Sequence, residues 1–443
     1  MTDRTPNLLL TGLLLALLAV GCQGDGAEVP PADAADPAST TDAPPPPTDG
    51  LTTVVDRLPL PDPATGPAAE PNLFAASDGR VHVTWFERLD DADYALRFAT
   101  LEPGGETWSA PRTIVERQDF FVNWADFPSI HELPDGTLAA HWLLRTGDGP
   151  VDYDVQIAWS EDGGDHWSDP VVPHRDGTES EHGFVSVVPV DPDERRIGAL
   201  WLDARNLVLA DSGRADGPRA MTLRWTTLTP EGLGEEVLLD DQVCDCCQTS
   251  AAMTSQGPVA VYRDRTDDEI RDISIVREVD GRWTEPAPIH DDGWQIAACP
   301  VNGPMIAADG DDVVVAWYTR GSDDKPRVRV AFSSDAGASF GTPVRVDEGN
   351  PGGRVAVELL PGGEALVSWL ENEGERATVR LRTVATTGAM GESIEVAATL
   401  SGRSSGFPRM ARAGSDLVFA WTDSSGDEPG VRTARARLVG NDR

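Results

Sequence analysis

The sequence predicts an all-β fold, a seven-bladed β-propeller, because one strand pattern recurs seven times at a regular spacing. Each copy is an apolar run around one aromatic residue, and successive copies lie 52 to 61 residues apart. The seven aromatic residues are Trp85, Trp142, Trp201, Tyr262, Trp317, Trp369 and Trp421. A repeat of this length holds about four strands of five or six residues with their turns. We therefore expect one four-stranded blade per repeat, with each blade packed mainly on its neighbours.

The fifth repeat illustrates the expected blade, with four strands in the order in which they leave the channel. The expected strands are Val301–Ala308, Val313–Trp317, Arg327–Ser333 and Pro343–Val346.

The seventh repeat supplies only three such strands: Arg409–Ala413, Leu417–Trp421 and Val431–Leu438. The missing outer strand is available as Leu51–Val55. We expect this N-terminal strand to complete the last blade and close the ring, which leaves no open sheet edge.

Two repeats carry the pattern Ser-x-Asp-x-Gly-x-x-aromatic, at Ser160–Trp167 and Ser333–Phe340. In such a hairpin turn the Asp side chain accepts backbone N–H groups and Gly supplies a positive φ. The pattern resembles the Asp box, or BNR repeat, of sialidase-like propellers. Sialidases of this family have six blades, so a six-bladed ring is the alternative fold. The family places these turns on the face opposite its active site.

The N-terminus has the pattern of an export signal, because the apolar run Leu8–Val20 is too short to span a membrane. It ends in Leu18-Ala19-Val20-Gly21-Cys22, which resembles the bacterial lipobox. The resemblance implies a signal peptide at residues 1–21, lipidation of Cys22 and, with Gln23 next, an outer-membrane location. An ordinary signal peptide is the alternative. Residues 22–50, rich in Pro, Ala and Asp, predict a disordered tether, and residues 51–443 the propeller.

The net charge of −38 excludes two classes of partner, nucleic acids and anionic lipid surfaces, because both are themselves negative. The expected partner is a glycan or an envelope protein, with membrane contact only through the N-terminal lipid, and a monomer is expected. The charge also has an alternative explanation, the composition of a salt-exposed or high-GC proteome.

Four cysteines lie in two adjacent repeats: Cys244, Cys246, Cys247 and Cys299. In an exported protein an even number predicts two disulfides, one of which should join Cys299 to the other three. A metal site formed with His182 is the weaker alternative, because no second paired motif supports it. The sequence predicts no cofactor and no resident metal ion.

The loops before the inner strands and after the second strands converge on one face, around the channel. Candidate ligand-binding residues on this face are Trp124, Asp126, His182, Arg263, Arg265, Trp294, Arg320, Arg354 and Arg409. Glu181 lies in one of the same loops. The alternating Arg and Asp/Glu residues from Arg263 to Asp272 are better explained as a solvated set of ion pairs than as a ligand clamp. An acid two residues after the anchor aromatic recurs in five repeats, which indicates a structural task at least as much as a catalytic one.

The sialidase resemblance implies an arginine triad, a Tyr nucleophile activated by Glu, and an Asp acid/base. The family's Phe/Tyr-Arg-Ile-Pro motif is missing, and the corresponding strand carries Glu70-Pro71-Asn72-Leu73. Tyr318 is the best candidate nucleophile, with Asp264 and Glu269 as candidate carboxylates, although Tyr318 also suits a packing role. The resemblance thus covers the fold and almost none of the catalytic pattern.

The resulting hypothesis is a lipid-anchored propeller that recognises an extracytoplasmic glycan and, in its stronger form, hydrolyses it as an exo-sialidase-like glycosidase. A non-catalytic scaffold or assembly protein is the alternative, because a fold does not fix a function. Metal handling through the cysteines is the weakest of the three.

Overall fold

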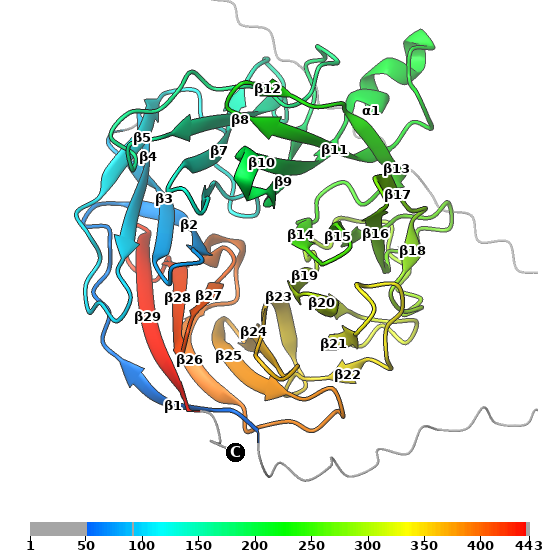
Figure 1. Ribbon diagram of the computed structural model, residues 1–443. Helices are drawn as coiled ribbons and strands as arrows, with labels where there is room; N and C mark the ends of the chain where they lie inside the picture. The colour runs from blue at the N-terminus through cyan, green and yellow to red at the C-terminus, as the bar shows by residue number, and fades with distance from the viewer. Residues whose placement is uncertain (1–50, 91–92, 440–443) are drawn as a thin grey trace, which may run out of the picture. The chain divides into compact units, whose positions relative to one another are not determined.

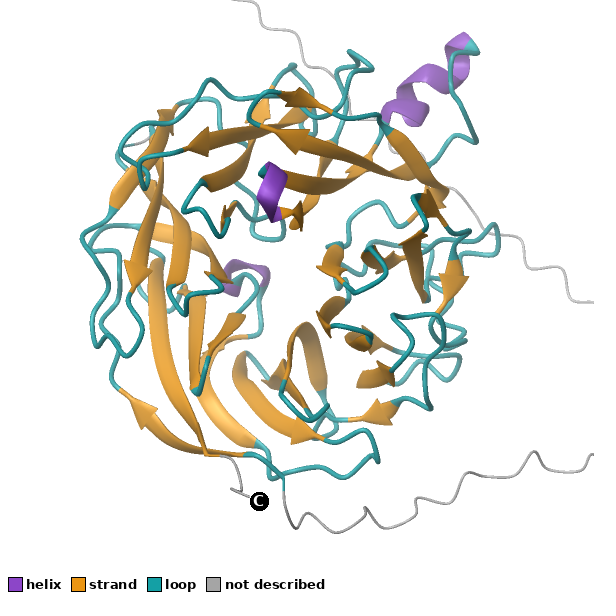
Figure 2. Cartoon of the chain, viewed as in Figure 1, coloured by secondary structure: helices purple, strands orange, loops and turns teal. Residues whose placement is uncertain are grey.

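The computed structural model describes residues 51–90 and 93–439. The described strands, all within the unit Pro45–Arg443, form seven sheets set around a central channel (Figure 1). The regular structure is almost entirely strand, and the few helices are short and lie in loops (Figure 2). The seven-bladed all-β propeller predicted from the repeats is therefore confirmed, and the six-bladed alternative is wrong.

Blades 1 to 3 follow the chain, and in each the second strand carries the anchor aromatic. Blade 1 contains β2 (Ala68–Ala75), β3 (Val81–Arg88), β4 (Tyr94–Leu101) and β5 (Arg112–Arg117). Blade 2 contains β6 (Ser129–Glu132), β7 (Leu138–Arg145) and β8 (Tyr153–Ser160). Blade 3 contains β9 (His182–Asp191), β10 (Arg196–Asp203), β11 (Met221–Thr229), β12 (Gly232–Leu233) and β13 (Val237–Val243).

Blades 4 to 7 continue in the same order around the ring. Blade 4 contains β14 (Ser250–Met253), β15 (Pro258–Arg263), β16 (Ile273–Val279), β17 (Arg282–Trp283) and β18 (Ala287–Pro288). Blade 5 contains β19 (Met305–Asp309), β20 (Asp312–Thr319), β21 (Arg327–Ser333) and β22 (Val344–Arg345). Blade 6 contains β23 (Pro351–Leu359), β24 (Ala365–Glu373), β25 (Arg376–Val384) and β26 (Ile394–Leu400). Blade 7 contains β27 (Arg409–Ala413), β28 (Asp416–Asp423), β29 (Gly430–Val439) and β1 (Thr53–Leu58). The helices are η1 (Pro192–Glu194), α1 (Arg205–Leu209), η2 (Ala210–Ser212) and η3 (Arg403–Ser405).

The ring is closed by the pairing of its first strand with its last. Strand β1 runs antiparallel to β29, with Thr53 opposite Val439 and Leu58 opposite Arg435. The prediction that the N-terminal strand completes the seventh blade is confirmed, although the strand begins two residues later and ends three residues later than expected. It ends directly before Pro59, whose nitrogen has no proton to donate to a ladder.

The blades are held to one another by side chains from neighbouring sheets. Trp142 of blade 2 packs in one cluster with Phe86 and Phe98 of blade 1, and Trp317 of blade 5 packs with Val261 of blade 4. Six of the seven anchor aromatics are buried, whereas Trp421 of the closing blade is partly exposed. Because each buried ring fills space between two sheets, its loss would leave a cavity worth about 3–5 kcal/mol.

The acids two residues after the anchors have a structural role in two blades. The indole nitrogen of Trp201 donates to Asp203 at 2.8 Å, and that of Trp369 donates to Glu371 at 2.7 Å. Glu371 also accepts the backbone N–H groups of Glu348 and Asn350. These carboxylates therefore satisfy buried donors at the ends of the second strands.

The two turns with the Ser-x-Asp-x-Gly pattern make the expected hydrogen bonds. Asp162 accepts the backbone N–H of His166 at 2.9 Å, and Asp335 accepts that of Ser339 at 2.9 Å. Gly164 and Gly337 both have a positive φ. The Asp side chains and the Gly residues of these turns thus stabilise the ends of hairpins.

In blade 5 the inner strand begins at Met305 and not at Val301 as predicted. Val301 has a φ of 47°, which is incompatible with an extended strand, and Pro304 has no N–H to donate. The preceding residues instead form a loop at the mouth of the channel.

The predicted signal peptide (residues 1–21), Cys22 and the tether (residues 22–50) lie outside the described residues. Among the residues that are described, none of the helices is long and apolar enough to cross a membrane.

Candidate active site at the mouth of the channel

The channel is a polar cavity of about 400 Å³, bounded by the inner strands of all seven blades. Its ionisable and amide side chains come from several different blades: Asp126, His131, Gln248, Glu358, Arg409 and Arg412. The side chain of Gln248 joins three blades at the cavity, because it donates to Ala125 O at 2.7 Å and accepts from Gly303 N at 3.0 Å. A cavity with this lining can hold a polar ligand or ordered water.

Asp126 precedes β6 and is buried at the cavity wall. Its carboxylate accepts the backbone N–H of Phe184, at the start of blade 3, at 2.7 Å. Burial raises the pKa of Asp126 to about 7, although the N–H of Phe184 opposes the shift. Of the predicted ligand-binding residues, Asp126 is thus the one whose environment leaves it partly protonated at neutral pH.

Glu181 lies in the loop before β9 and is held by a tyrosine of the neighbouring blade. The Tyr153 hydroxyl donates to Glu181 Oε1 at 2.9 Å. Burial raises the pKa of Glu181 to about 7, because desolvation outweighs the hydrogen bond from Tyr153, and the charge of Asp126 raises it further. The Glu181 side chain is half-buried.

Gly183 explains how the two carboxyls come together. A Cβ at this position would lie 2.4 Å from Asp126 Oδ2 and 2.9 Å from the Tyr153 hydroxyl. Only glycine allows both groups to approach the same stretch of backbone. Asp126, Tyr153 and Glu181 therefore form one cluster, which we call the carboxyl pair with its tyrosine.

Tyr153 itself is 1% exposed and stacks on Phe121 with 3.8 Å between ring centroids. Burial raises its pKa well above the usual range. A phenol that is buried, protonated and already donating cannot reach a substrate carbon. Its chemical contribution is to orient Glu181.

The four cysteines gather beside this cluster, in the loops before β14 and β19. All four are free in the structure, so the two predicted disulfides are not seen, and their pairing stays a prediction. The sulfurs of Cys244, Cys246 and Cys247 lie within 4.8 Å of one another, and Cys246 also reaches Cys299. The expected approach of Cys299 to the other three cysteines is thus present.

The candidate carboxylates Asp264 and Glu269 are occupied by other partners. Glu269 accepts 2.7 Å bonds from both Arg265 and Arg271, and these arginines lower its pKa. Asp264 accepts from Ser274 at 2.9 Å, and burial raises its pKa. Arg265 also pairs with Asp245, so this segment forms the ion-pair loop that the sequence offered as an alternative.

Arg263 and Trp294 are core residues of this region. Arg263 donates to three backbone carbonyls, those of Asn302, Arg271 and Tyr318, at 2.5 to 3.0 Å. Its guanidinium lies 4.8 Å from the ring centroid of Trp294, which is only 3% exposed. A guanidinium and an indole used in this way hold adjacent loops together and leave no free face for a sugar.

Tyr318 packs edge-on against Trp294 at 5.6 Å and interacts with Arg320. Arg320 in turn pairs with Asp324. Burial raises the pKa of Tyr318, and its contacts do not include Asp264 or Glu269. The structure places the candidate nucleophile and the candidate carboxylates in separate sets of contacts.

Trp124 and Arg354 lie on the other side of the mouth. Arg354 donates to Ser405 Oγ and to Gly406 O at 2.6 Å, and its guanidinium lies 5.2 Å from the Trp124 ring. Trp124 is half-buried and also stacks on Phe407. Arg409 donates to Asn72 at 2.9 Å and faces the cavity. Trp124 is partly exposed, whereas the guanidinium of Arg354 donates hydrogen bonds to backbone carbonyls.

Glu70 is a buried carboxyl that interacts with the charge of Arg354. Burial raises its pKa to about 8, against the opposing charge of Arg354. Glu70 Oε2 is buried without a hydrogen-bond partner.

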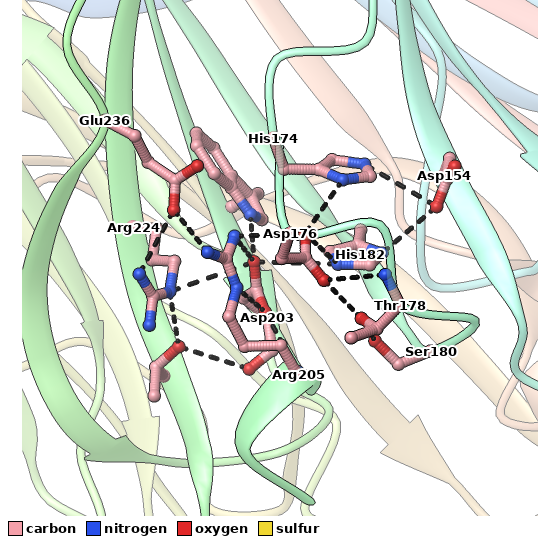
Figure 3. A network of polar contacts seen from close by, with 12 residues as sticks. Asp154, His174, Asp176, Thr178, Ser180, His182, Asp203, Arg205, Arg224 and Glu236 are labelled. Atoms are coloured by element: carbon pink, nitrogen blue, oxygen red, sulfur yellow. Dashed lines mark hydrogen bonds and ion pairs between the residues drawn. The ribbon is translucent and has the colours of Figure 1, made fainter. Parts of the chain in front are cut away.

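His182 belongs to a different cluster, in which two imidazoles stack between carboxylates (Figure 3). His174 and His182 are parallel, with centroids 3.7 Å apart. Asp154 faces one edge of both rings and Asp176 the other, at N···O distances of 3.1 to 3.6 Å. Asp203 and Arg205 continue the network into blade 3. We call these residues the imidazole network.

Burial alone would lower the pKa of His182, but Asp154 and Asp176 raise it to about 10. The pKa of Asp176 is correspondingly far below its usual range, because the hydrogen bonds from His174 and His182 outweigh burial. The nitrogens of His182 thus face carboxylates and not the cysteines, so the metal site predicted as the alternative is not assembled from His182.

The sequence reasoning missed Tyr153 as a site residue and left Glu181 without a role. Tyr153 begins β8, the third strand of its blade, and a backbone bridge to Glu181, in the loop before β9, brings the two residues together. The usable signal was the scarcity of tyrosine, with four in the chain.

No protein-family model matches the chain, and no curated protein matches it either. Among solved structures, a protein of unknown function from Dyadobacter fermentans aligns with a TM-score of 0.51 and 14% identity, over 88% of this chain and 99% of that one. An α-L-arabinofuranosidase from Fusarium graminearum aligns with a TM-score of 0.46 and 14% identity, over 87% of this chain and 98% of that one. The NanB sialidase from Streptococcus pneumoniae aligns with a TM-score of 0.41 and 13% identity, over 89% of this chain and 71% of that one. At such identities these likenesses concern the propeller fold.

Proposed function

We propose that this protein is a cell-envelope propeller that binds an extracytoplasmic glycan at the channel mouth and cleaves a glycosidic bond there. The observation that carries the proposal is the carboxyl pair with its tyrosine. Glycosidases need two carboxyl groups, one protonated and one ionised, on either side of the scissile bond. Asp126 and Glu181, each with a pKa of about 7, provide one proton between them at neutral pH.

Glu181 is the better general acid, because its side chain is half-buried whereas Asp126 is only 3% exposed. Its bond from Tyr153 at 2.9 Å fixes the orientation of the carboxyl. Asp126, at the cavity wall, can accept a proton from a water molecule inside the channel. General acid and base groups typically contribute 10²–10⁴-fold each.

The arginines indicate a neutral sugar in preference to a sialic acid. Gripping a sugar carboxylate requires arginines with free donors. Arg263 and Arg354 donate to backbone oxygens, and Arg265 and Arg320 pair with carboxylates. The net charge of −38 also repels an anionic chain.

The test is hydrolysis of a panel of methylumbelliferyl glycosides, neutral pentosides and hexosides beside a sialoside, by the full-length protein. We expect cleavage of a neutral glycoside that falls at least 100-fold in Glu181→Gln and in Asp126→Asn. Glu161→Gln is the matched control, because Glu161 lies in an exposed hairpin turn and pairs only with Arg195. Loss of activity in the control as well, or no cleavage of any glycoside together with no binding to a glycan array, would refute the proposal.

A non-catalytic scaffold is the second candidate. The observation that favours it is the internal use of Arg263, Trp294 and Arg354, which leaves much of this face occupied by its own contacts. A scaffold predicts that the Glu181→Gln variant retains all binding to its envelope partner and that no glycoside is turned over.

The envelope location is part of the same proposal and rests on the lipobox-like residues 18–22. We expect the protein to partition into detergent and the Cys22→Ser variant to remain in the aqueous phase. Intact mass should reveal a diacylglyceryl modification at Cys22. An unmodified cysteine in the membrane fraction would contradict the anchor.

A further inference from the structure

The second constellation beside the channel is the group of four cysteines, and its chemistry does not depend on the proposed glycosidase activity. Cys244, Cys246 and Cys247 lie in the loop before blade 4, and Cys299 in the loop before blade 5. Cys244 and Cys247 are fully buried, Cys246 is partly buried and Cys299 is exposed. The group thus extends from the protein interior to the surface.

The four sulfurs lie close together, and the closest two, those of Cys244 and Cys247, are 3.0 Å apart. The three sulfurs of the first loop lie within 4.8 Å of each other, and Cys246 is within hydrogen-bonding reach of the other three. Because Zn–S bonds measure about 2.3 Å, sulfurs around one tetrahedral ion lie about 3.8 Å apart. Cys244 and Cys247, at 3.0 Å, need to separate by less than 1 Å to reach that spacing.

A buried arginine identifies the charge state that this group requires. Arg271 is 2% exposed, and its Nε and Nη2 donate to Glu269. Its Nη1 is buried without a hydrogen-bond partner, and the guanidinium interacts with the thiol of Cys244. A thiolate satisfies this donor, whereas the sulfur of a disulfide is neutral and would leave a buried guanidinium N–H almost unpaired.

The surroundings also suit a metal–thiolate complex. Four thiolates around one Zn²⁺ or Cu⁺ carry a net negative charge, which needs cationic neighbours in a protein with a net charge of −38. Arg263 and Arg271 supply that charge at Cys244. Thiolates are the ligands that soft d¹⁰ ions prefer, and carboxylates are not.

We infer that Cys244, Cys246, Cys247 and Cys299 bind one thiophilic d¹⁰ metal ion, Zn²⁺ or Cu⁺, which links the loops of blades 4 and 5. Binding displaces the thiol protons to solvent and involves no change of oxidation state. The exposed position of Cys299 gives the ion a route into the site.

The experiment uses the full-length protein, isolated without oxygen and examined by elemental analysis and by mass spectrometry of its cysteines. We expect about one zinc or copper ion per chain, and stoichiometric uptake of Zn²⁺ alone or Cu⁺ alone by the metal-free protein. The Cys246→Ser variant should bind neither ion. Cys22→Ser, which removes the only cysteine outside the group, is the matched control and should bind as the unaltered protein does.

Cys299→Ser provides a second variant, because an exposed residue can be replaced with little risk to folding. We expect its metal affinity to fall about tenfold or more, since one of four ligands is lost while three remain. If peptide mapping finds two disulfides in the isolated protein and the reduced protein takes up neither ion, the inference is overturned. It is also overturned if Cys246→Ser binds metal as tightly as Cys22→Ser.

Discussion

Two clusters of ionisable side chains adjoin at Glu181 and His182, and their electrostatics are opposite. In the carboxyl pair with its tyrosine, the hydrogen bonds to the carboxylates do not offset the cost of burying their charge. Burial therefore raises the pKa values of Asp126 and Glu181 to about 7. In the imidazole network burial lowers the pKa of His182, but the neighbouring carboxylates outweigh this effect. They raise the pKa to about 10, so His182 remains protonated. A cluster of acids and histidines is therefore not in itself a reactive site. Reactivity at neutral pH depends on whether each charge already has its counter-charge.

The sharpest way to break the imidazole network is Asp203→Asn. Asp203 accepts from Trp201 and from Arg205, and its pKa is lowered because these bonds and the charge of His182 outweigh burial. The substitution removes the carboxylate charge that faces Arg205 and His182. Breaking buried ion pairs in this way lowers the free energy of unfolding by about 3–5 kcal/mol. Urea denaturation should reveal a loss of this size.

Asp423→Asn is the matched control, because Asp423 holds the same position after the anchor of blade 7 and forms an exposed pair with Arg432. The Asp423→Asn substitution should lower the free energy of unfolding by less than about 1 kcal/mol. Equal midpoints for the two variants would show that the network contributes nothing beyond surface pairing.

The pH dependence of stability separates the two clusters, because they act in different windows. Glu181 has a folded pKa raised from 4.5 to about 7, so the free energy of unfolding falls as pH rises through that range. His182 has a folded pKa raised from 6.5 to about 10, so its contribution is complete below 6.5 and is lost as pH rises to 10. Each effect is on the order of 3–5 kcal/mol.

We expect Glu181→Gln to reduce the slope only in the lower window and His182→Gln only in the upper one, when denaturant unfolding is measured at intervals from pH 4.5 to 10. Self-repulsion of the acidic surface adds a common slope, which cancels in the comparison of variants. Identical pH profiles for the two variants would contradict the assignment.

Most of the fold follows from the sequence, because the anchor aromatics report the blade period directly. The strands Arg327–Ser333 and Arg409–Ala413 have the predicted limits, since their apolar residues alternate and turn residues bound them. The inner strand of blade 5 does not, because Val301 has a positive φ that its apolar side chain does not predict.

The site was less predictable, for a physical reason. The topology placed Asp126, His182 and the cysteines on one face, and the approach of Cys299 to Cys246 follows from the adjacency of two blades. The use of a side chain is decided by its partners, however. Whether Arg263 grips a ligand or three backbone carbonyls depends on loops from blade 5, whose course is a tertiary property.

The protonation of the carboxyl pair can be measured directly by infrared titration of carboxylic acid C=O bands. Glu70, Asp240 and Glu358 also have raised pKa values, so the spectrum of each variant must be subtracted from that of the unaltered protein. We predict that Glu181→Gln and Asp126→Asn each remove a band that titrates near pH 7. If the difference spectra contain only carboxyls that ionise below about pH 5, the ordinary range for Asp and Glu, the pair is fully ionised at neutral pH and the proposed acid catalysis is wrong.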